Sequence, residues 1–266
     1  MSDEAIFRRK GTWFRWLMAA CAGWGILHAT PALARTSAPK NPPAFHEVAR
    51  RAASAREAGS IAAAIRLYEE GVRLNPAWQE GFWYLGSLEY DNNQYPQAAA
   101  TLRRLTILNP RMSAAWALLG LSEYETKGFS RAFSHLQRAR ELGNTPELAH
   151  AADYHLALLF NLRGEFEKAR TLLSKLVLAG VNSEDVQVGL GLSLLRVPLL
   201  PAQLDPSKDA LVHDAGNVGG LLAHSEQDRA DLAFRDLLTK YPRVPFAHYA
   251  YGTALASRGK EEAAAK

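Results

Sequence analysis

Cysteine is almost absent from this 266-residue chain, since the single one is Cys21. Disulfide bonds, thiolate nucleophiles and cysteine-ligated zinc are therefore excluded for the rest of the sequence. A strong excess of positive charge is also lacking, because 31 Lys and Arg stand against 27 Asp and Glu, a net charge of +4. Counterion-driven binding needs a marked basic excess, so we expect no nucleic-acid partner.

Motifs that carry catalysis are missing as well. The sequence contains no G-x-S-x-G, no G-x-x-x-x-G-K-[ST] and no H-E-x-x-H. His150, Asp153 and His155 lie close together, but His155 is five residues from His150, which is a poor spacing for metal ligands on one helix face. The glycine-rich stretch 216–220 follows no strand, and we interpret it as close helix packing or local weakness. We expect no enzymatic activity, no cofactor and no metal.

Residues 1–34 have the organisation of a secretory signal peptide. A basic cluster at residues 8–10 precedes an apolar run at 16–27, and small residues end the segment at Ala32-Leu33-Ala34. The apolar run is much shorter than a membrane span, which needs about 20 residues. We expect cleavage after Ala34 and export to the periplasm or the outside of the cell. The alternative is an uncleaved membrane anchor formed by residues 12–34.

Residues 35–44 are rich in Ser, Pro and Lys and predict a disordered linker. Beyond them the chain repeats itself with a fixed period, which indicates stacked supersecondary units. The period appears in three independent ladders: Gly86 and Gly120; Ala64, Ala98 and Ala132; and Asn75-Pro76 and Asn109-Pro110.

Each period contains two amphipathic segments. In residues 79–109 apolar side chains recur at helical spacing on both sides of a polar turn at 91–94, which predicts a helical hairpin. Asn109-Pro110 ends the second helix, because proline cannot continue it and restricts the residue before it. The recurring glycine and alanine let two helices approach closely, while Leu, Phe and Tyr fill the space beside them.

These units resemble the tetratricopeptide repeat family. The family pattern Trp-x2-Leu-Gly is present at residues 116–120, and Phe82-x2-Leu85-Gly86 stands one repeat earlier. The later Ala-x3-Phe/Tyr step is matched at residues 64–68. The family's tyrosine after Leu-Gly is replaced by Glu89 and Glu123, with Tyr90 and Tyr124 one place later. The resemblance implies an all-α fold, a right-handed superhelical solenoid of helix-turn-helix repeats.

The period also predicts where the repeats and the linker between them begin and end. Residues 45–196 hold about four repeats plus one helix, 197–208 form a Pro-rich irregular linker, and 209–266 hold a degraded repeat plus a truncated final one. The few residues after 259 are too short to cover Tyr249, Tyr251 and Leu255 of that last unit. This predicts either a longer solenoid or an end covered by another chain, and self-association through the C-terminal end is a further alternative.

The resemblance also implies that a concave groove, lined by the first helix of each repeat, binds a partner protein or peptide. The alternative is that these side chains only pack between repeats. The positions that the family pattern assigns to the groove are Trp83, Ser87, Tyr90, Leu121, Tyr124, Tyr154, Leu158 and Asn161.

The sequence therefore predicts a non-catalytic interaction scaffold. The alternative function is an N-terminal interaction module of a larger envelope enzyme or assembly. Membrane attachment is expected only through an uncleaved leader. Arginines that recur on the predicted helices, Arg103-Arg104 among them, are interpreted as solvated faces.

Overall fold

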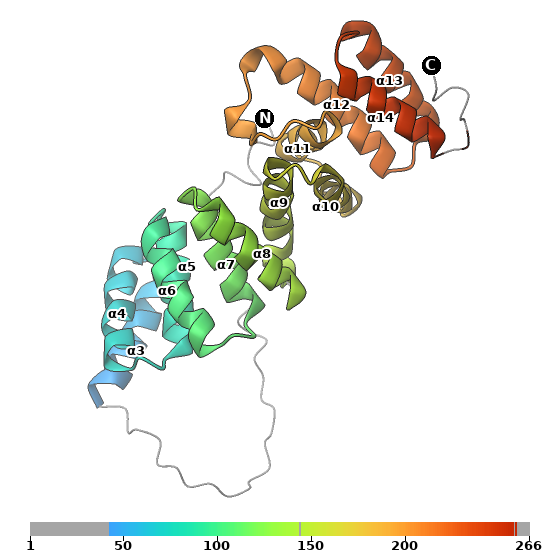
Figure 1. Ribbon diagram of the computed structural model, residues 1–266. Helices are drawn as coiled ribbons and strands as arrows, with labels where there is room; N and C mark the ends of the chain where they lie inside the picture. The colour runs from blue at the N-terminus through green and yellow to red at the C-terminus, as the bar shows by residue number, and fades with distance from the viewer. Residues whose placement is uncertain (1–42, 144, 258, 260–266) are drawn as a thin grey trace, which may run out of the picture. The chain divides into compact units, whose positions relative to one another are not determined.

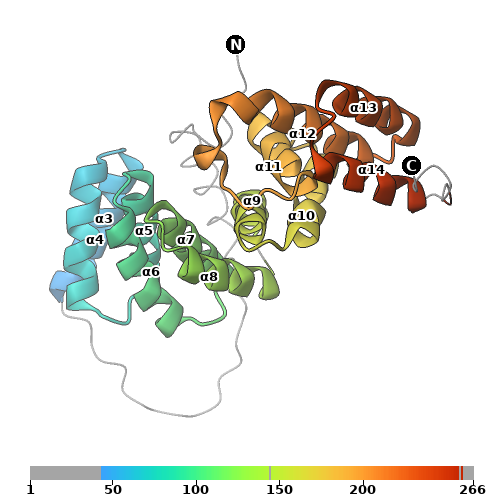
Figure 2. The same ribbon diagram turned by 45° about the horizontal axis from the view of Figure 1, so that its top comes forward.

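The computed structural model describes residues 43–143, 145–257 and 259. All regular elements in this part of the chain are helices, so the expected all-α architecture is confirmed (Figures 1 and 2). The predicted leader and most of the predicted linker lie outside the described residues. The α-helices are α3 Pro43–Glu57, α4 Ile61–Leu74, α5 Gln79–Asp91, α6 Tyr95–Leu108, α7 Ser113–Glu125, α8 Phe129–Glu141, α9 Pro146–Leu162, α10 Phe166–Leu178, α11 Glu184–Leu194, α12 Asp209–Ala223, α13 Gln227–Lys240 and α14 Pro245–Ala256.

The described chain divides into two compact units, which we call the N-terminal unit (residues 43–149) and the C-terminal unit (residues 150 onward). The division falls within α9 and not at the Pro-rich stretch 197–208. That stretch lies inside the C-terminal unit because the helices on either side of it, α11 and α12, pack against each other. Each unit is described by itself below.

In the N-terminal unit every helix from α3 to α8 packs against the next one along the chain (Figure 1). The glycine ladder explains how the hairpins close. A Cβ on Gly86 would lie 2.7 Å from Cγ of Leu102, and a Cβ on Gly120 would lie 2.7 Å from Cγ of Leu136. The two glycines therefore occupy equivalent close helix crossings, as the sequence period predicts. The alanine ladder is confirmed too, since Ala64, Ala98 and Ala132 are fully buried.

The turns within these hairpins repeat with the same period. Gly59, Asn93 and Lys127 all have a positive φ, between 60° and 70°, and each lies two residues after the end of the first helix of a hairpin. The backbone N–H of the next residue then bonds five residues back, as from Gln94 to the carbonyl of Glu89. This is the usual left-handed end of a helix, which satisfies carbonyl groups that the helix leaves unpaired. The second helices end one residue before Asn75 and Asn109, as the Asn-Pro pairs predict.

In the C-terminal unit α11 and α12 cross with their backbones in contact. A Cβ on Gly191 would collide with the backbone carbonyl of Val212, and a Cβ on Gly216 would collide with that of Gln187. The interpretation of the glycine-rich stretch as close helix packing is therefore confirmed at Gly216. No described atom lies within 4 Å of a Cβ built on Gly220, so that glycine has no packing role.

The last described helix, α14, is better covered than the sequence suggested. The ring of Tyr251 stacks on Phe234 with centroids 4.8 Å apart, and Leu255 is buried. The expectation that both are left uncovered is therefore wrong, because Phe234 of α13 packs on the ring of Tyr251 and Leu255 is 4% exposed. Tyr249 stays half exposed, with the guanidinium of Arg196 4.9 Å from its ring centroid. Among the described helices, none is long and apolar enough to span a membrane.

Candidate functional site

The first helices of the N-terminal unit carry five of the eight predicted groove residues. Trp83, Ser87 and Tyr90 lie on α5 at spacings of four and three, so they share one face of that helix. Trp83 and Ser87 are buried and Tyr90 is half-buried. The hydroxyl of Ser87 has no hydrogen-bond partner among the described residues. A buried hydroxyl without a partner is unusual in proteins.

The neighbouring first helix, α7, repeats the pattern one period later. Leu121 is buried and Tyr124 is half-buried. The ring of Tyr124 meets Phe129 edge to face at 5.4 Å, just as Tyr90 meets Tyr95 at 5.3 Å. Both tyrosines are therefore held in place by an aromatic ring of their own hairpin. Among the five residues, these two tyrosines retain the most accessible surface.

The other three predicted groove residues belong to the C-terminal unit. Tyr154 and Leu158 on α9 are buried, and so is Asn161. The side-chain amide of Asn161 donates a 3.1 Å hydrogen bond to the carbonyl of Gly189 on α11. Asn161 therefore ties two helices of its own unit together.

A charged cluster on α7 was not predicted from the sequence. Glu123 is buried, yet three nitrogen groups surround its carboxylate. Arg103 Nη2 donates to Oε1 at 2.7 Å, Arg131 Nε lies 3.3 Å from the same oxygen, and His135 Nδ1 lies 2.6 Å from Oε2. These partners come from α6 and α8, the helices on either side of α7. Arg103 is therefore not part of a merely solvated face, because its guanidinium reaches inward to a buried acid.

Burial alone would raise the pKa of Glu123, because the charged form loses its hydration. Hydrogen bonds from His135 and Arg103 act in the opposite direction and prevail, so the pKa of Glu123 lies below its ordinary value of 4.5. The sequence did contain a signal for this cluster. A carboxylate on the buried side of a repeat needs a cation, and Arg103, Arg131 and His135 stand at helical positions that face it.

The equivalent residue one repeat earlier, Glu89, has a pKa that is raised and not lowered. Glu89 on α5 is equally buried, and its Oε2 has no hydrogen-bond partner among the described residues. The residues that stand one period before the three cations around Glu123 are Glu69, Gln97 and Thr101. Burial is the main influence on the pKa of this carboxyl group, and a side-chain interaction with Thr101 acts in the opposite direction. Burial, assisted by the nearby charge of Glu69, raises the pKa of Glu89 to about 7.

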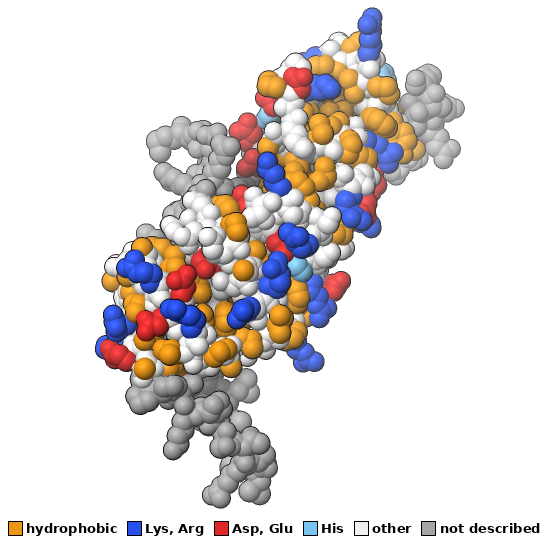
Figure 3. Space-filling model, turned by 60° about the vertical axis from the view of Figure 1, so that its left-hand side comes forward, with side chains coloured by type: hydrophobic (Ala, Val, Ile, Leu, Met, Phe, Trp, Pro, Cys, Tyr) orange, Lys and Arg blue, Asp and Glu red, His pale blue; other side chains and the backbone are white. Residues whose placement is uncertain are grey.

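Glu89 lies at the base of a hollow of about 650 Å³ between α4 and α6. We call it the Glu89 cleft. Phe82 and Leu85 of α5 form its apolar base beside Glu89, and side chains of α4 and α6 form its rim, with Pro76 just after α4. The rim residues are Glu69, Val72, Arg73, Pro76, Ala100, Thr101 and Arg104. On the face shown in Figure 3, acidic, basic and apolar side chains are interspersed over the described surface.

Replacing Glu89 with glutamine is expected to stabilise the N-terminal unit at pH 8. Folded Glu89 holds its proton up to about pH 7, whereas the unfolded chain releases it near 4.5. Its contribution to the free energy of unfolding is therefore complete below pH 4.5 and is lost as the pH rises through 7. Glutamine does not titrate, so the variant does not lose this stability as the pH rises. We expect its free energy of unfolding to exceed that of the unaltered chain by about 1 kcal/mol at pH 8 and by almost nothing at pH 4.5.

Urea unfolding followed by tryptophan fluorescence measures this effect, because Trp78, Trp83 and Trp116 all lie in the N-terminal unit. An equal stability change at both pH values would contradict the assignment of the raised pKa to Glu89.

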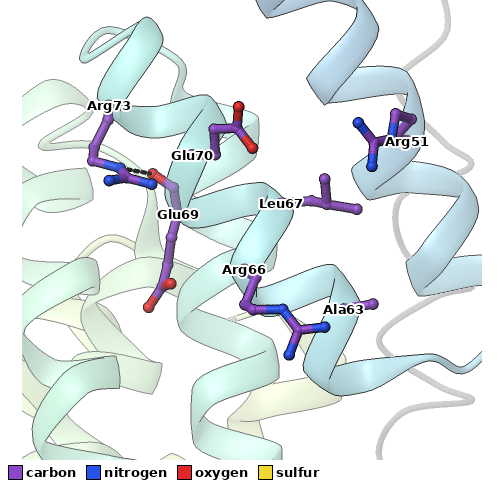
Figure 4. Close-up of a pocket in the computed structure, with 7 residues that line it drawn as sticks. All are labelled: Arg51, Ala63, Arg66, Leu67, Glu69, Glu70 and Arg73. Carbon is purple, nitrogen blue, oxygen red and sulfur yellow. Dashed lines mark hydrogen bonds between the residues drawn. The ribbon is translucent and has the colours of Figure 1, made fainter.

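A second hollow, of about 430 Å³, lies between α3 and α4 (Figure 4). Arg51 of α3 and the exposed side chains Arg66, Glu70 and Arg73 of α4 line it. Arg73 Nε donates to the backbone carbonyl of Glu69 at 3.3 Å. The lining mixes both charge signs and contains no buried polar group, so it does not form a specific site. Within the described residues no cluster of three His, Cys, Asp or Glu is arranged to hold a metal ion.

The hairpins that carry Glu89 and Glu123 are similar to a known protein family. Residues 84–146 match the family model of the tetratricopeptide repeat. The match covers the end of α5 and all of α6, α7 and α8, which include Gly86, Gly120 and both glutamates. The tetratricopeptide repeat resemblance seen in the sequence is therefore supported over this part of the chain. No curated protein matches the sequence.

Two solved structures are similar to this chain. The crystal structure of MamA protein has a TM-score of 0.52 and 19% sequence identity, over 70% of this chain and 94% of that chain. A tetratricopeptide repeat protein from Parabacteroides merdae has a TM-score of 0.49 and 12% identity, over 83% of this chain and 89% of that chain. At such low identity the first of these likenesses shows a shared helical-repeat fold and nothing about partners.

Proposed function

We propose that this protein is a non-catalytic scaffold that holds a partner protein or peptide against the first-helix faces of its repeats. The observation that carries the proposal is the row of Trp83, Ser87 and Tyr90 on α5, with Tyr124 one repeat later. Aromatic residues with a polar tip are the ones that most often anchor protein interfaces.

The tetratricopeptide repeat match supports the same class of function, since helical repeat arrays present extended surfaces to proteins. Tyr154, Leu158 and Asn161 remain part of the proposed groove of the C-terminal unit. Export, directed by residues 1–34, also remains a proposal. It is tested by sequencing the N-terminus of the mature protein, which is expected to begin at Arg35 and would contradict cleavage if it began at Met1.

The double variant Tyr90→Ala, Tyr124→Ala is expected to lose the partner. These two side chains are half-buried, so their removal disturbs the fold less than removal of the buried Trp83. Loss of two aromatic anchors predicts a decrease in captured partner of at least about tenfold. The measurement is crosslinking in cells followed by affinity capture of the tagged chain and quantitative mass spectrometry.

The matched control is Ile107→Ser, which changes a side chain that is 74% exposed on α6, a second helix. The control is expected to capture the same proteins as the unaltered chain, and circular dichroism checks that all variants remain helical. If the double variant captures the same proteins in the same amounts, the first-helix face of the N-terminal unit is not the binding surface.

A further inference from the structure

The Glu89 cleft holds a buried acid that the described chain leaves half satisfied. Glu89 is 4% exposed, its Oε2 has no hydrogen-bond partner among the described residues, and the hollow above it is large enough for a side chain. A buried carboxylate of this kind costs free energy unless a donor or a cation meets it. The carboxylate of Glu89 therefore lacks the hydrogen-bond donor or cation that a buried acid requires.

The next repeat of the same chain shows which group meets that requirement. Glu123 occupies the same hairpin position as Glu89 one period later, and Arg103 of the preceding helix donates to it at 2.7 Å. The residue one period before Arg103 is Glu69, an acid. The guanidinium that completes the later site is therefore missing from the earlier one, and the earlier site has open space in its place.

The rim arginines do not supply the missing group. Arg73 directs its Nε to the backbone carbonyl of Glu69. Arg104 corresponds to Arg138 one repeat later, and Arg138 pairs with Glu141 and not with Glu123. The electrostatic neighbour that acts on Glu89 is the acid Glu69, so the potential at the base of the cleft favours a cation from outside.

We propose that the Glu89 cleft is a docking site for an arginine side chain of a partner protein, with the guanidinium bound to the Glu89 carboxylate. Phe82 and Leu85 then contact the aliphatic stem of the arginine, and Glu69 at the rim contributes a second negative charge. An arginine fits better than a lysine because its planar fork donates to two oxygens at once.

This site is distinct from the groove of the proposed function. Phe82, Leu85 and Glu89 form one row along α5, whereas Trp83, Ser87 and Tyr90 form another. At about 100° per residue the centres of the two rows lie roughly 130° apart around the helix. The proposal therefore does not depend on the groove, and its test can fail or succeed independently.

The probe is a capped Gly-Arg-Gly tripeptide, compared with Gly-citrulline-Gly, which has nearly the same shape and no charge. Backbone amide chemical shifts of the ¹⁵N-labelled full chain are followed by NMR at pH 8, where Glu89 is ionised. We expect the arginine peptide to produce saturable shifts at Glu89 and Thr101, and the citrulline peptide to bind at least about tenfold more weakly.

Two variants connect the binding to the cleft. Glu89→Gln keeps the shape of the side chain and is expected to weaken arginine binding at least about tenfold while the fold is retained. Glu69→Arg places a guanidinium at the position equivalent to Arg103, so it is expected to fill the cleft from within and abolish peptide binding. Its matched control is Glu70→Arg, the adjacent change of charge on α4, which points toward the other hollow and is expected to leave binding unaltered (Figure 4).

The double variant Tyr90→Ala, Tyr124→Ala is expected to bind the arginine peptide normally, which separates this site from the groove. Equal binding of the citrulline peptide, or unaltered binding by Glu89→Gln, would overturn the proposal. Absence of saturable shifts would overturn it as well, since water alone then satisfies the carboxylate.

Discussion

Replacing Glu123 with glutamine is expected to lower the free energy of unfolding of the N-terminal unit by about 2 kcal/mol at neutral pH. The substitution removes charge-assisted hydrogen bonds from Arg103 and His135 while keeping the size of the side chain. The cost stays below that of a fully buried ion pair because the side chains of Arg103 and Arg131 are 49% and 66% exposed. Both arginines can therefore turn toward water when the carboxylate is gone.

The pH dependence gives this prediction a second readout. The pKa of folded Glu123 lies below 4.5, so its contribution to stability is complete above that pH and is lost as the pH falls through the folded pKa. Urea unfolding followed by tryptophan fluorescence at pH 7 and at pH 3.5 measures it. The variant is expected to be less stable at pH 7 and to approach the unaltered chain in acid.

Glu89→Gln is the matched control for Glu123→Gln, because it makes the same chemical change one repeat earlier. The two substitutions are expected to change stability with opposite signs at pH 8. If both destabilise the unit by similar amounts, the surroundings of the two glutamates do not differ in the way described.

Replacing Gly191 with alanine is expected to destabilise the C-terminal unit by about 3 kcal/mol. The added Cβ collides with the backbone carbonyl of Val212, and a backbone cannot move aside as a flexible side chain can. The helices α11 and α12 must therefore separate, which opens the contacts among Leu192, Val212, Ala215 and Val218 in the core of this unit. Faster hydrogen exchange of the backbone amides in α11 and α12 measures this loss of stability.

The control is Gly220→Ala on the neighbouring helix α12. No described atom lies within 4 Å of its built Cβ, so the alanine enters open space. Its better helix propensity predicts a gain of up to about 1 kcal/mol. Faster exchange in both variants would show that glycine content as such, and not the backbone crossing at Gly191, sets the stability of this helix pair.

The hairpins could be predicted from the sequence because their packing depends on residues at a fixed spacing. Gly86 and Gly120 indicate a close crossing because each recurs with a leucine at the same place in the following helix, and the structure puts Leu102 and Leu136 against them. The Asn-Pro pairs indicate helix ends for a local reason, the restricted backbone before proline. Such signals need no knowledge of distant contacts.

The charged features were harder to predict because they depend on neighbours from other helices. Glu89 and Glu123 look alike in sequence, and only their different surroundings on α4, α6 and α8 make one paired and the other unpaired. Close packing was predicted for the stretch that contains Gly216, but its partner helix, α11, could not be predicted for the same reason. Gly191 and Gly216 lie on opposite sides of the irregular stretch 197–208, so no repeat spacing connects them.

The difference between Glu89 and Glu123 has a consequence for arrays of this kind. The glycine crossing that closes each hairpin is the same in both copies, since Gly86 meets Leu102 and Gly120 meets Leu136. The charged residues of one repeat can therefore differ from those of the next without a change in the packing of the neighbouring repeats. Consecutive repeats can in this way carry an ion-paired glutamate in one repeat and a protonated glutamate in another. Ligand preference can therefore differ from repeat to repeat along a single scaffold.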